Sequence, residues 1–472
     1  MYKSLSKLDP LNGYAARFLN IVNWQRWLSW LQLSTNRRIF SAAITVGVFT
    51  ALVSVVTALK DVAIAHRFGT GDALDAFLMA YLLPSFAVNI IAGSFNSAVI
   101  PTYIQVRDRQ GNLASQQLFS SVMMWSMALL LVVSVVLALS MHYILPMLAS
   151  GFSPQKLELT QSLFFVLLPV IVISGIATIW SSVLNAWERF LIGALAPIMV
   201  PVAILASLLL FGNIWGIFSL AVGTVVGYVL QCILLAVALK KHHIHLFFRW
   251  HGVTPELKKI IGQYSPMVAG AFLMSSTGLV DQAMAAMLRH GSVATLNYGN
   301  KIVTFVVGLG AMAIGTAVLP HFSQMVANRD LSGIRHTLKI YTRLILIVTV
   351  PLTVILFFMS EYIVSVLFER GVFVRQDAQL AGKVQALYLL QIPFHLLGIL
   401  FVRLISSLHN NIILMWGAVI SLPLNVILNF ILMQKIGVAG IALSTSLVYM
   451  ASCSYLGGMV LYLLRRNKQL HG

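Results

Sequence analysis

The sequence predicts an all-α membrane protein of about twelve transmembrane helices in two six-helix lobes, preceded by an N-terminal helix in the membrane interface. Composition is the first indication, because 59% of the 472 residues are hydrophobic and only 9% are charged. Soluble domains carry about 25% charged residues. The second indication is a series of apolar stretches long enough to span a bilayer. The third is an internal repeat with a nearly constant offset of 219 to 222 residues.

Residues 1–37 precede the first long apolar stretch. They contain neither the continuous apolar core nor the small-residue cleavage site of a signal peptide. Ile21, Trp24, Leu28 and Leu31 fall on one helical face, with further Trp and Arg residues around it. This pattern is typical of an amphipathic helix lying in the interface. An irregular cytoplasmic tail is the alternative for this segment.

Twelve spans follow, since a bilayer-spanning helix needs about 20 mainly apolar residues. They are predicted near residues 40–65, 74–102, 117–148, 158–185, 191–212, 215–239, 260–288, 293–322, 340–359, 379–402, 411–433 and 437–464. The first six form an N-terminal lobe, 38–240, and the last six a C-terminal lobe, 260–464. A cytoplasmic linker, 241–259, joins the lobes, and residues 465–472 form a cytoplasmic tail. Prolines within spans, such as Pro169, Pro197 and Pro393, predict kinks or breaks.

The formal net charge of +18 comes largely from basic residues between the spans. The positive-inside rule accounts for such an excess without a nucleic-acid partner. With the N-terminus inside, 22 of the 31 lysines and arginines fall in cytoplasmic tails, loops or helix ends. Both termini are therefore predicted to be cytoplasmic.

The internal repeat relates the two lobes. Residues 97–101 (SAVIP) recur as residues 316–320 (TAVLP), and Asp61 recurs as Asp281. Five residues from Gly216 to Cys232 recur at an offset of 221, which makes Thr445 the counterpart of Thr224. Six helices followed by six of the same orientation make a parallel repeat about an axis along the membrane normal. Such folds hold their passenger between the lobes and alternate access by rocking one lobe against the other.

Charged residues interrupt the apolar sequence between positions 58 and 101. Lys60, Asp61, Arg67 and Asp75 are the candidates for a wet interior, because a charge inside a bilayer is costly and usually functional. Asp72 is a further charge in this stretch, and for Arg67 and Asp72 the alternative role is capping of the loop between two helices. For Lys60 and Asp61, which lie more than two turns before that loop, a role in binding is preferred.

The repeat points to Asp281, Asn300 and Lys301 in the second lobe. Lys60 and Lys301 are predicted to face each other across the central cleft, with Asp61 and Asp281 as their partners. Cations on both walls suit a phosphate or pyrophosphate, which lysine binds as a point charge. The alternative is that each lysine pairs with a neighbouring aspartate for structural reasons only. Asn425 and Asn429, one turn apart, are candidates for an ion site or for interhelical hydrogen bonds.

No enzyme is expected. The chain contains no phosphate-binding loop of the Walker type, no nucleophile elbow and no zinc-protease motif. Two cysteines, both within apolar stretches, indicate neither a disulfide framework nor a metal cluster, so no cofactor and no metal are predicted. Without an ATP site, transport would depend on the membrane potential, an ion gradient or the passenger's own gradient.

Several stretches resemble the MurJ/MviN lipid II flippases, of the multidrug/oligosaccharidyl-lipid/polysaccharide exporter superfamily. Residues 61–77 (DVAIAHRFGTGDALDAF), with Pro84, Gly93 and residues 95–101, resemble the family's first two helices. Residues 184–197 are similar to its junction between helices four and five. Residues 296–320 are similar to its eighth helix, and residues 367–377 (LFERGVFVRQD) to its outer loop between helices nine and ten.

This resemblance implies a flippase of the bacterial inner membrane with a cationic cavity between two lobes. Its partners would be an undecaprenyl-pyrophosphate-linked glycan and membrane lipids, with coupling to the membrane potential or a monovalent cation. The chain departs from the family's pattern at Lys60 and Lys301, where arginine is common, and at Val88 and Asn89, where a basic pair is common. It also has twelve predicted helices where that family usually has fourteen. An exopolysaccharide or O-unit lipid flippase, and a drug or cation antiporter of the same superfamily, are the alternatives.

Overall fold

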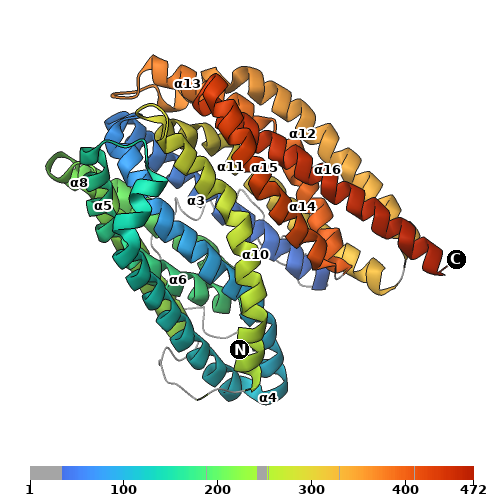
Figure 1. Ribbon diagram of the computed structural model, residues 1–472. Coiled ribbons are helices and arrows are strands. Elements are labelled where there is room, and N and C mark those ends of the chain that lie inside the picture. The colour runs from blue at the N-terminus through green and yellow to red at the C-terminus, as the bar shows by residue number, and fades with distance from the viewer. Residues whose placement is uncertain are drawn as a thin grey trace, which may run out of the picture.

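The computed structural model describes residues 35–187, 189–241, 252, 255–328, 330–408 and 410–471. Every regular element in these ranges is a helix, and the helices form two groups that Figure 1 shows side by side. The predicted interfacial segment lies outside the described residues up to position 34. The predicted linker, 241–259, lies largely outside them as well.

The N-terminal group begins with α3 (Thr35–Phe68) and α4 (Asp72–Leu148), followed by α5 (Pro154–Leu167) and α6 (Pro169–Ala186). It continues with α7 (Phe190–Leu195), the 3₁₀ turn η1 (Ala196–Ile198), α8 (Met199–Trp215) and α9 (Phe218–Lys241). The C-terminal group consists of α10 (Pro255–Ala286), α11 (Ser292–Ala327), α12 (Leu331–Phe368), α13 (Arg375–Leu389), α14 (Ile392–Ser407), α15 (Asn411–Ile436) and α16 (Val438–His471).

Helix α4 is a hairpin of two spans. Gly111 has φ 85° and ψ 179°, a conformation outside the helical range that glycine adopts easily. Tyr103 and Phe119 lie on either side of it and would be about 24 Å apart along a straight helix. Their ring centroids are 6.5 Å apart, so the chain reverses direction at Gly111. The two predicted spans at 74–102 and 117–148 are the two arms of this hairpin.

The fold class is confirmed. Ten helical segments in the described part of the chain are long and apolar enough to cross a membrane, the α4 hairpin counting as one of them. Helix α10, with 32 residues, is outside these ten but is also long enough to span a bilayer. Counting the two arms of α4 separately gives eleven such segments in the described part of the chain, and α10 meets the length requirement alone.

Three of the mid-span prolines coincide with helix breaks. Pro169 begins α6 directly after α5, Pro197 lies in η1 between α7 and α8, and Pro393 stands at the start of α14. Proline is favoured at the first positions of a helix because it has no N–H to leave unpaired there. Pro351 and Pro423, in contrast, lie inside continuous helices.

The repeat is also visible in the backbone conformation of two corresponding glycines. Gly216 separates α8 from α9 with φ 52° and ψ −126°, and Gly437 separates α15 from α16 with φ 62° and ψ −140°. These positions are 221 residues apart and share a left-handed φ that other residues rarely adopt. The helix pairs α8–α9 and α15–α16 are thus the same turn built twice.

Two apolar clusters hold the molecule together. One lies mainly within the N-terminal group and includes Val99, Met123 and Leu184, with Tyr264 of α10 packed against it. The other crosses between the groups and includes Ile64 of α3 and Val293 of α11. Helix α10 is therefore the element of the C-terminal group that packs most extensively on the N-terminal group, against α4 (Figure 1).

Candidate functional site

Three charged side chains meet between α3 and α11, and we call them the triad. Asp61 accepts from the Lys60 ammonium at 2.8 Å through Oδ1 and from the Lys301 ammonium at 3.0 Å through Oδ2. The Asp61 side chain is only 8% exposed, whereas that of Lys301 is 32% exposed. One buried carboxylate thus holds two cations, one from each group of helices, and the more accessible cation is Lys301.

The triad lies at membrane depth and carries a net positive charge. Lys60 is eight residues before the end of α3, and Lys301 is nine residues after the start of α11. At 1.5 Å per residue, both lie about 12 to 14 Å from the helix ends that face each other. Two ammonium groups against one carboxylate leave a formal excess of one positive charge in this apolar region. An anion that pairs with Lys301 would share this lysine with Asp61, and the excess cation would partly balance the added negative charge.

Asp281 does not partner Lys301, contrary to the prediction. It is 6% exposed and accepts from Asn425 Nδ2 at 3.0 Å, Asn429 Nδ2 at 2.7 Å and Thr445 Oγ1 at 2.9 Å. Asn425 and Asn429 are fully buried. The repeat correctly indicates a buried carboxylate at this position, but the face of α10 that carries Asp281 points toward α15 and α16 rather than toward α11.

Asp75 joins the two groups of helices at the other end of the site. Its side chain is 1% exposed. Its Oδ2 accepts from the backbone N–H of Gly291 at 2.8 Å, and its Oδ1 from that of Ala294 at 2.8 Å. The first N–H groups of a helix have no partner within the helix and attract negative charge. Asp75 of α4 therefore caps α11 of the opposite group.

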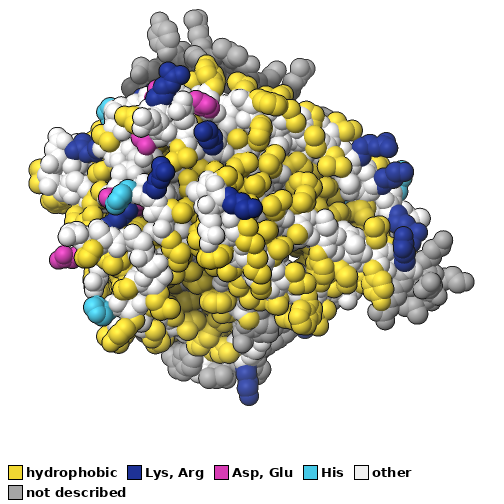
Figure 2. Space-filling model, turned by 45° about the horizontal axis from the view of Figure 1, so that its top comes forward, with side chains coloured by type: hydrophobic (Ala, Val, Ile, Leu, Met, Phe, Trp, Pro, Cys, Tyr) yellow, Lys and Arg dark blue, Asp and Glu magenta, His cyan; other side chains and the backbone are white. Residues whose placement is uncertain are grey.

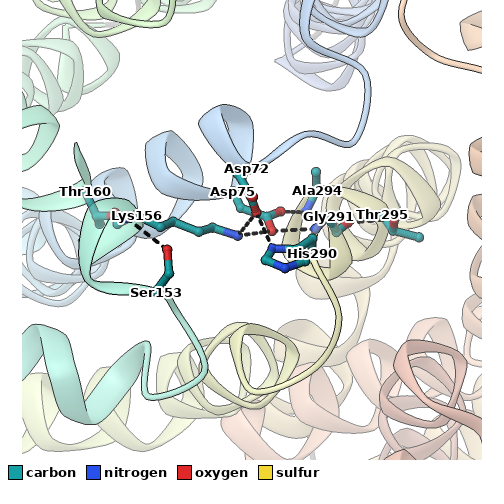
Figure 3. Close-up of polar contacts among 9 residues, drawn as sticks. All are labelled: Asp72, Asp75, Ser153, Lys156, Thr160, His290, Gly291, Ala294 and Thr295. Carbon is teal, nitrogen blue, oxygen red and sulfur yellow. Dashed lines mark hydrogen bonds and ion pairs between the residues drawn. The ribbon is translucent and has the colours of Figure 1, made fainter. Parts of the chain in front are cut away.

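A lysine and a histidine extend this contact (Figure 3). Lys156, near the start of α5, reaches Asp72 Oδ1 at 2.6 Å and Asp75 Oδ2 at 2.8 Å. Asp72 also contacts His290 Nδ1 at 2.9 Å. We call Asp72, Asp75, Lys156, His290 and the first turn of α11 the latch. In Figure 3 the two aspartates stand between the lysine on one side and the start of α11 on the other.

Close backbone approach completes the seal around the latch. Gly291, with φ 78°, has no room for a side chain because a Cβ there would collide with the Thr70 carbonyl. A Cβ on Gly151 would lie 2.5 Å from the Ala286 carbonyl oxygen. Thr70 also donates to Asp377 Oδ1 at 2.6 Å. The two groups of helices therefore touch through backbone as well as side chains at this end.

The remaining candidates, Arg67 and Asn300, are not members of either cluster. Arg67 donates to Asn213 Oδ1 at the end of α8 and packs over Gly212, which is a structural contact within the N-terminal group. Asn300 is half-buried next to Lys301 on α11. Arg67 is about 9 Å further along α3 than Asp61.

Lys156, His290 and Thr445 were not among the predicted site residues. Ser153 caps the start of α5, because its side chain accepts a hydrogen bond from the backbone N–H of Lys156. That capping sequence was a visible signal for the helix start but not for the direction of the lysine side chain. Thr445 did stand out in the repeat, as the counterpart of Thr224. Its contact with Asp281 depends on how α16 is rotated, which the repeat does not encode.

These features define a membrane transporter: two groups of membrane-spanning helices that pack through α10 and α4 and meet again at the latch, with the triad between them. Solved structures support the fold. One described as "Lipid II flippase MurJ, inward closed conformation" aligns with a TM-score of 0.76 and 23% identity, covering 88% of this chain and 87% of that one. An inward-facing MATE family transporter of the MOP superfamily aligns with a TM-score of 0.72 and 12% identity, covering 91% of this chain and all of that one.

The chain belongs to the family described as "Lipid II flippase MurJ", whose profile matches residues 64–472. The "Probable lipid II flippase MurJ" of Buchnera aphidicola subsp. Acyrthosiphon pisum is 26% identical over 413 residues, which are 86% of this chain and 80% of that protein. The "Lipid II flippase MurJ" of Burkholderia cenocepacia is 25% identical over 452 residues, which are 92% of this chain and 85% of that protein. The resemblance inferred from the motifs is confirmed.

Proposed function

We propose that this protein translocates lipid II, an undecaprenyl-pyrophosphate-linked glycan, from the inner to the outer leaflet of the bacterial inner membrane. The observation that carries the proposal is the triad, in which Asp61 holds Lys60 and Lys301 at membrane depth with one positive charge in excess. A pyrophosphate entering this region would find an accessible ammonium in a low-dielectric setting, where charge pairing is strong. The relatives of this chain are named lipid II flippases.

The latch supplies the second requirement of alternating access, a barrier on one side of the binding site. The triad lies about 12 to 14 Å from the sealed end, so a passenger bound there could leave toward that end only after the latch separates. On the topology predicted from the basic residues, the sealed end is periplasmic and both termini are cytoplasmic. The arrangement then represents a state that loads from the cytoplasmic side.

The cluster around Asp281 is a candidate for coupling to a monovalent cation. Asn429 Oδ1 is buried without a hydrogen-bond partner among the described residues. The amide groups of Asn425 and Asn429 direct NH₂ toward Asp281, and a 180° rotation of each would present oxygens instead. Asp281, the two amide oxygens and Thr445 would then form an all-oxygen set, which hard cations prefer. We propose that a monovalent cation binds at this site, and that its gradient, together with the membrane potential, supplies the energy for transport.

An antiporter that exports drugs or cations is less well supported. Cationic passengers require acidic walls, whereas the triad carries an excess of positive charge. The likeness to MATE transporters at 12% identity concerns the fold alone.

The test is replacement of the lipid II flippase of a host by this chain under conditional depletion. We expect restored growth and lipid II at the outer leaflet. Lys301→Ala should fail to restore either, whereas Glu158→Gln, an exposed carboxylate of α5 outside both clusters, should restore both. Normal expression without rescue, combined with a requirement for a surface polysaccharide, would assign the passenger to an exopolysaccharide or O-unit lipid.

A further inference from the structure

A long groove runs along the outer face of the C-terminal group, away from the triad and the latch. It encloses about 720 Å³ between α12 and α16, with α14 beneath. Its walls and floor are largely apolar, formed by Leu338 and Leu346 of α12, Phe401 of α14, and Val460 and Leu461 of α16. The groove is a property of the C-terminal group alone, so its role is independent of the passenger proposed above.

The sequence builds the groove from two matching helical stripes. The lining residues of α12 recur from position 335 to 347 at intervals of three and four, and those of α16 do the same from 457 to 465. This spacing places each set on one face of its helix. Gly457 allows α16 to approach the Phe401 ring closely, because a Cβ there would lie only 3.2 Å from that ring. The two stripes face each other without closing on one another.

Four cations line the groove: Arg335, Lys339 and Arg343 follow one another at one-turn intervals along α12, and Arg465 lies on α16. None of the ion pairs within the described residues involves them. Arg335 donates to the Leu464 carbonyl at 2.8 Å, and none of the groove's lining residues is acidic. In Figure 2 one group of Lys and Arg side chains lies at the right edge, the side on which Figure 1 marks the C-terminus, and others are spread over the left half of the view.

These cations lie where a bilayer has its headgroups. Helix α12 has 38 residues and is about 57 Å long, which exceeds the hydrocarbon thickness of about 30 Å. Its first turns, which carry Arg335 and Lys339, therefore extend into the interfacial layer, and Arg343 lies one turn deeper. Long basic side chains at this level keep their charge in the polar region while their stems cover apolar surface. On the predicted topology, this is the cytoplasmic leaflet.

We propose that the groove binds one anionic phospholipid, with its phosphate among Arg335, Lys339 and Arg343 and its acyl chains along the apolar walls between α12 and α16. Charge complementarity carries the assignment: the cations take part in no ion pair among the described residues, and basic pockets between transmembrane helices suit anionic headgroups. A soluble anion would leave the apolar walls uncovered. A zwitterionic phospholipid would cover the walls but not neutralise the excess positive charge.

The experiment is lipid titration of the full chain in detergent, read by native mass spectrometry with 1-palmitoyl-2-oleoyl phosphatidylglycerol. The phosphatidylcholine with the same acyl chains is the matched lipid. Lys339→Gln with Arg343→Gln removes two charges from the groove. Lys240→Gln with Lys241→Gln, at the exposed end of α9, removes two charges elsewhere. Leu461→Trp fills the groove at an exposed position and keeps every charge.

We expect one tightly retained phosphatidylglycerol in the unmodified protein and the α9 variant. Its affinity should fall about thirtyfold in the Lys339 and Arg343 variant, given the contribution of each cation near an anionic headgroup. Leu461→Trp should also lose the retained lipid. Equal retention of phosphatidylcholine would overturn the proposal, as would an equal loss in the α9 variant or full retention in either groove variant.

Discussion

Replacement of Asp75 by asparagine should open the seal between the two groups of helices. The aspartate accepts two backbone N–H groups at the start of α11 and the Lys156 ammonium, each at 2.8 Å. Hydrogen bonds to a charged group contribute about 1.5 to 3 kcal/mol each. Asparagine retains the shape and one acceptor but loses the charge, and its NH₂ group faces another donor. Lys156 keeps Asp72 as a partner, which limits the loss.

We therefore expect the latched state to lose about 3 kcal/mol relative to the separated state, a shift of about a hundredfold in their ratio. The assay is the distance between spin labels at Gln155 and Gln376, which are exposed and lie on opposite groups of helices. The short distance should give way to a longer population in Asp75→Asn. Glu158→Gln, which removes an exposed carboxylate from α5, is the control and should leave the distance unchanged. Identical distance distributions in Asp75→Asn and the control would refute the reasoning.

Three further outcomes are expected. Lys301→Ala should abolish translocation while Lys301→Arg retains part of it, because the passenger phosphate needs a cation at this depth; full complementation by Lys301→Ala at normal expression would contradict this. Translocation in vesicles should depend on a monovalent cation, and Asp281→Asn should remove that dependence; an unchanged dependence would exclude the Asp281 cluster as the coupling site. A cysteine at Gln376 should react with a membrane-impermeant reagent from outside, and one at Gln110 only from inside; external labelling of Gln110 would reverse the topology.

The helices were predictable because their signal is local. Apolar stretches of sufficient length determine where spans lie, and glycines mark where the chain must turn, as Gly111 does within α4. The repeat added information about residues far apart in the sequence, because it identified Asp281 as the counterpart of Asp61. Both aspartates are buried. Such features depend on composition and spacing, which a single sequence contains.

The partners of the charges were not predictable, because they depend on helix rotation and on how the two groups meet. Asp61 and Asp281 occupy equivalent positions, yet one binds two lysines and the other binds two asparagines and a threonine. A perfect repeat would give them the same surroundings. The neighbouring helices differ between the two groups, so the same residue acquires a different role in each.

The triad and the latch act on the same interface, which bears on how a passenger could change the conformation. Lys301 is tied to the N-terminal group only through Asp61 among the described ion pairs. A pyrophosphate that pairs with Lys301 competes with Asp61 for it and so weakens one contact across the interface. A ligand shifts a conformational equilibrium only by its differential affinity for the two states. The passenger must therefore bind the separated state more tightly than the latched state, by at least the free energy that the latch contributes. The anionic headgroup can do so only if Lys301 becomes more accessible when Asp61 withdraws.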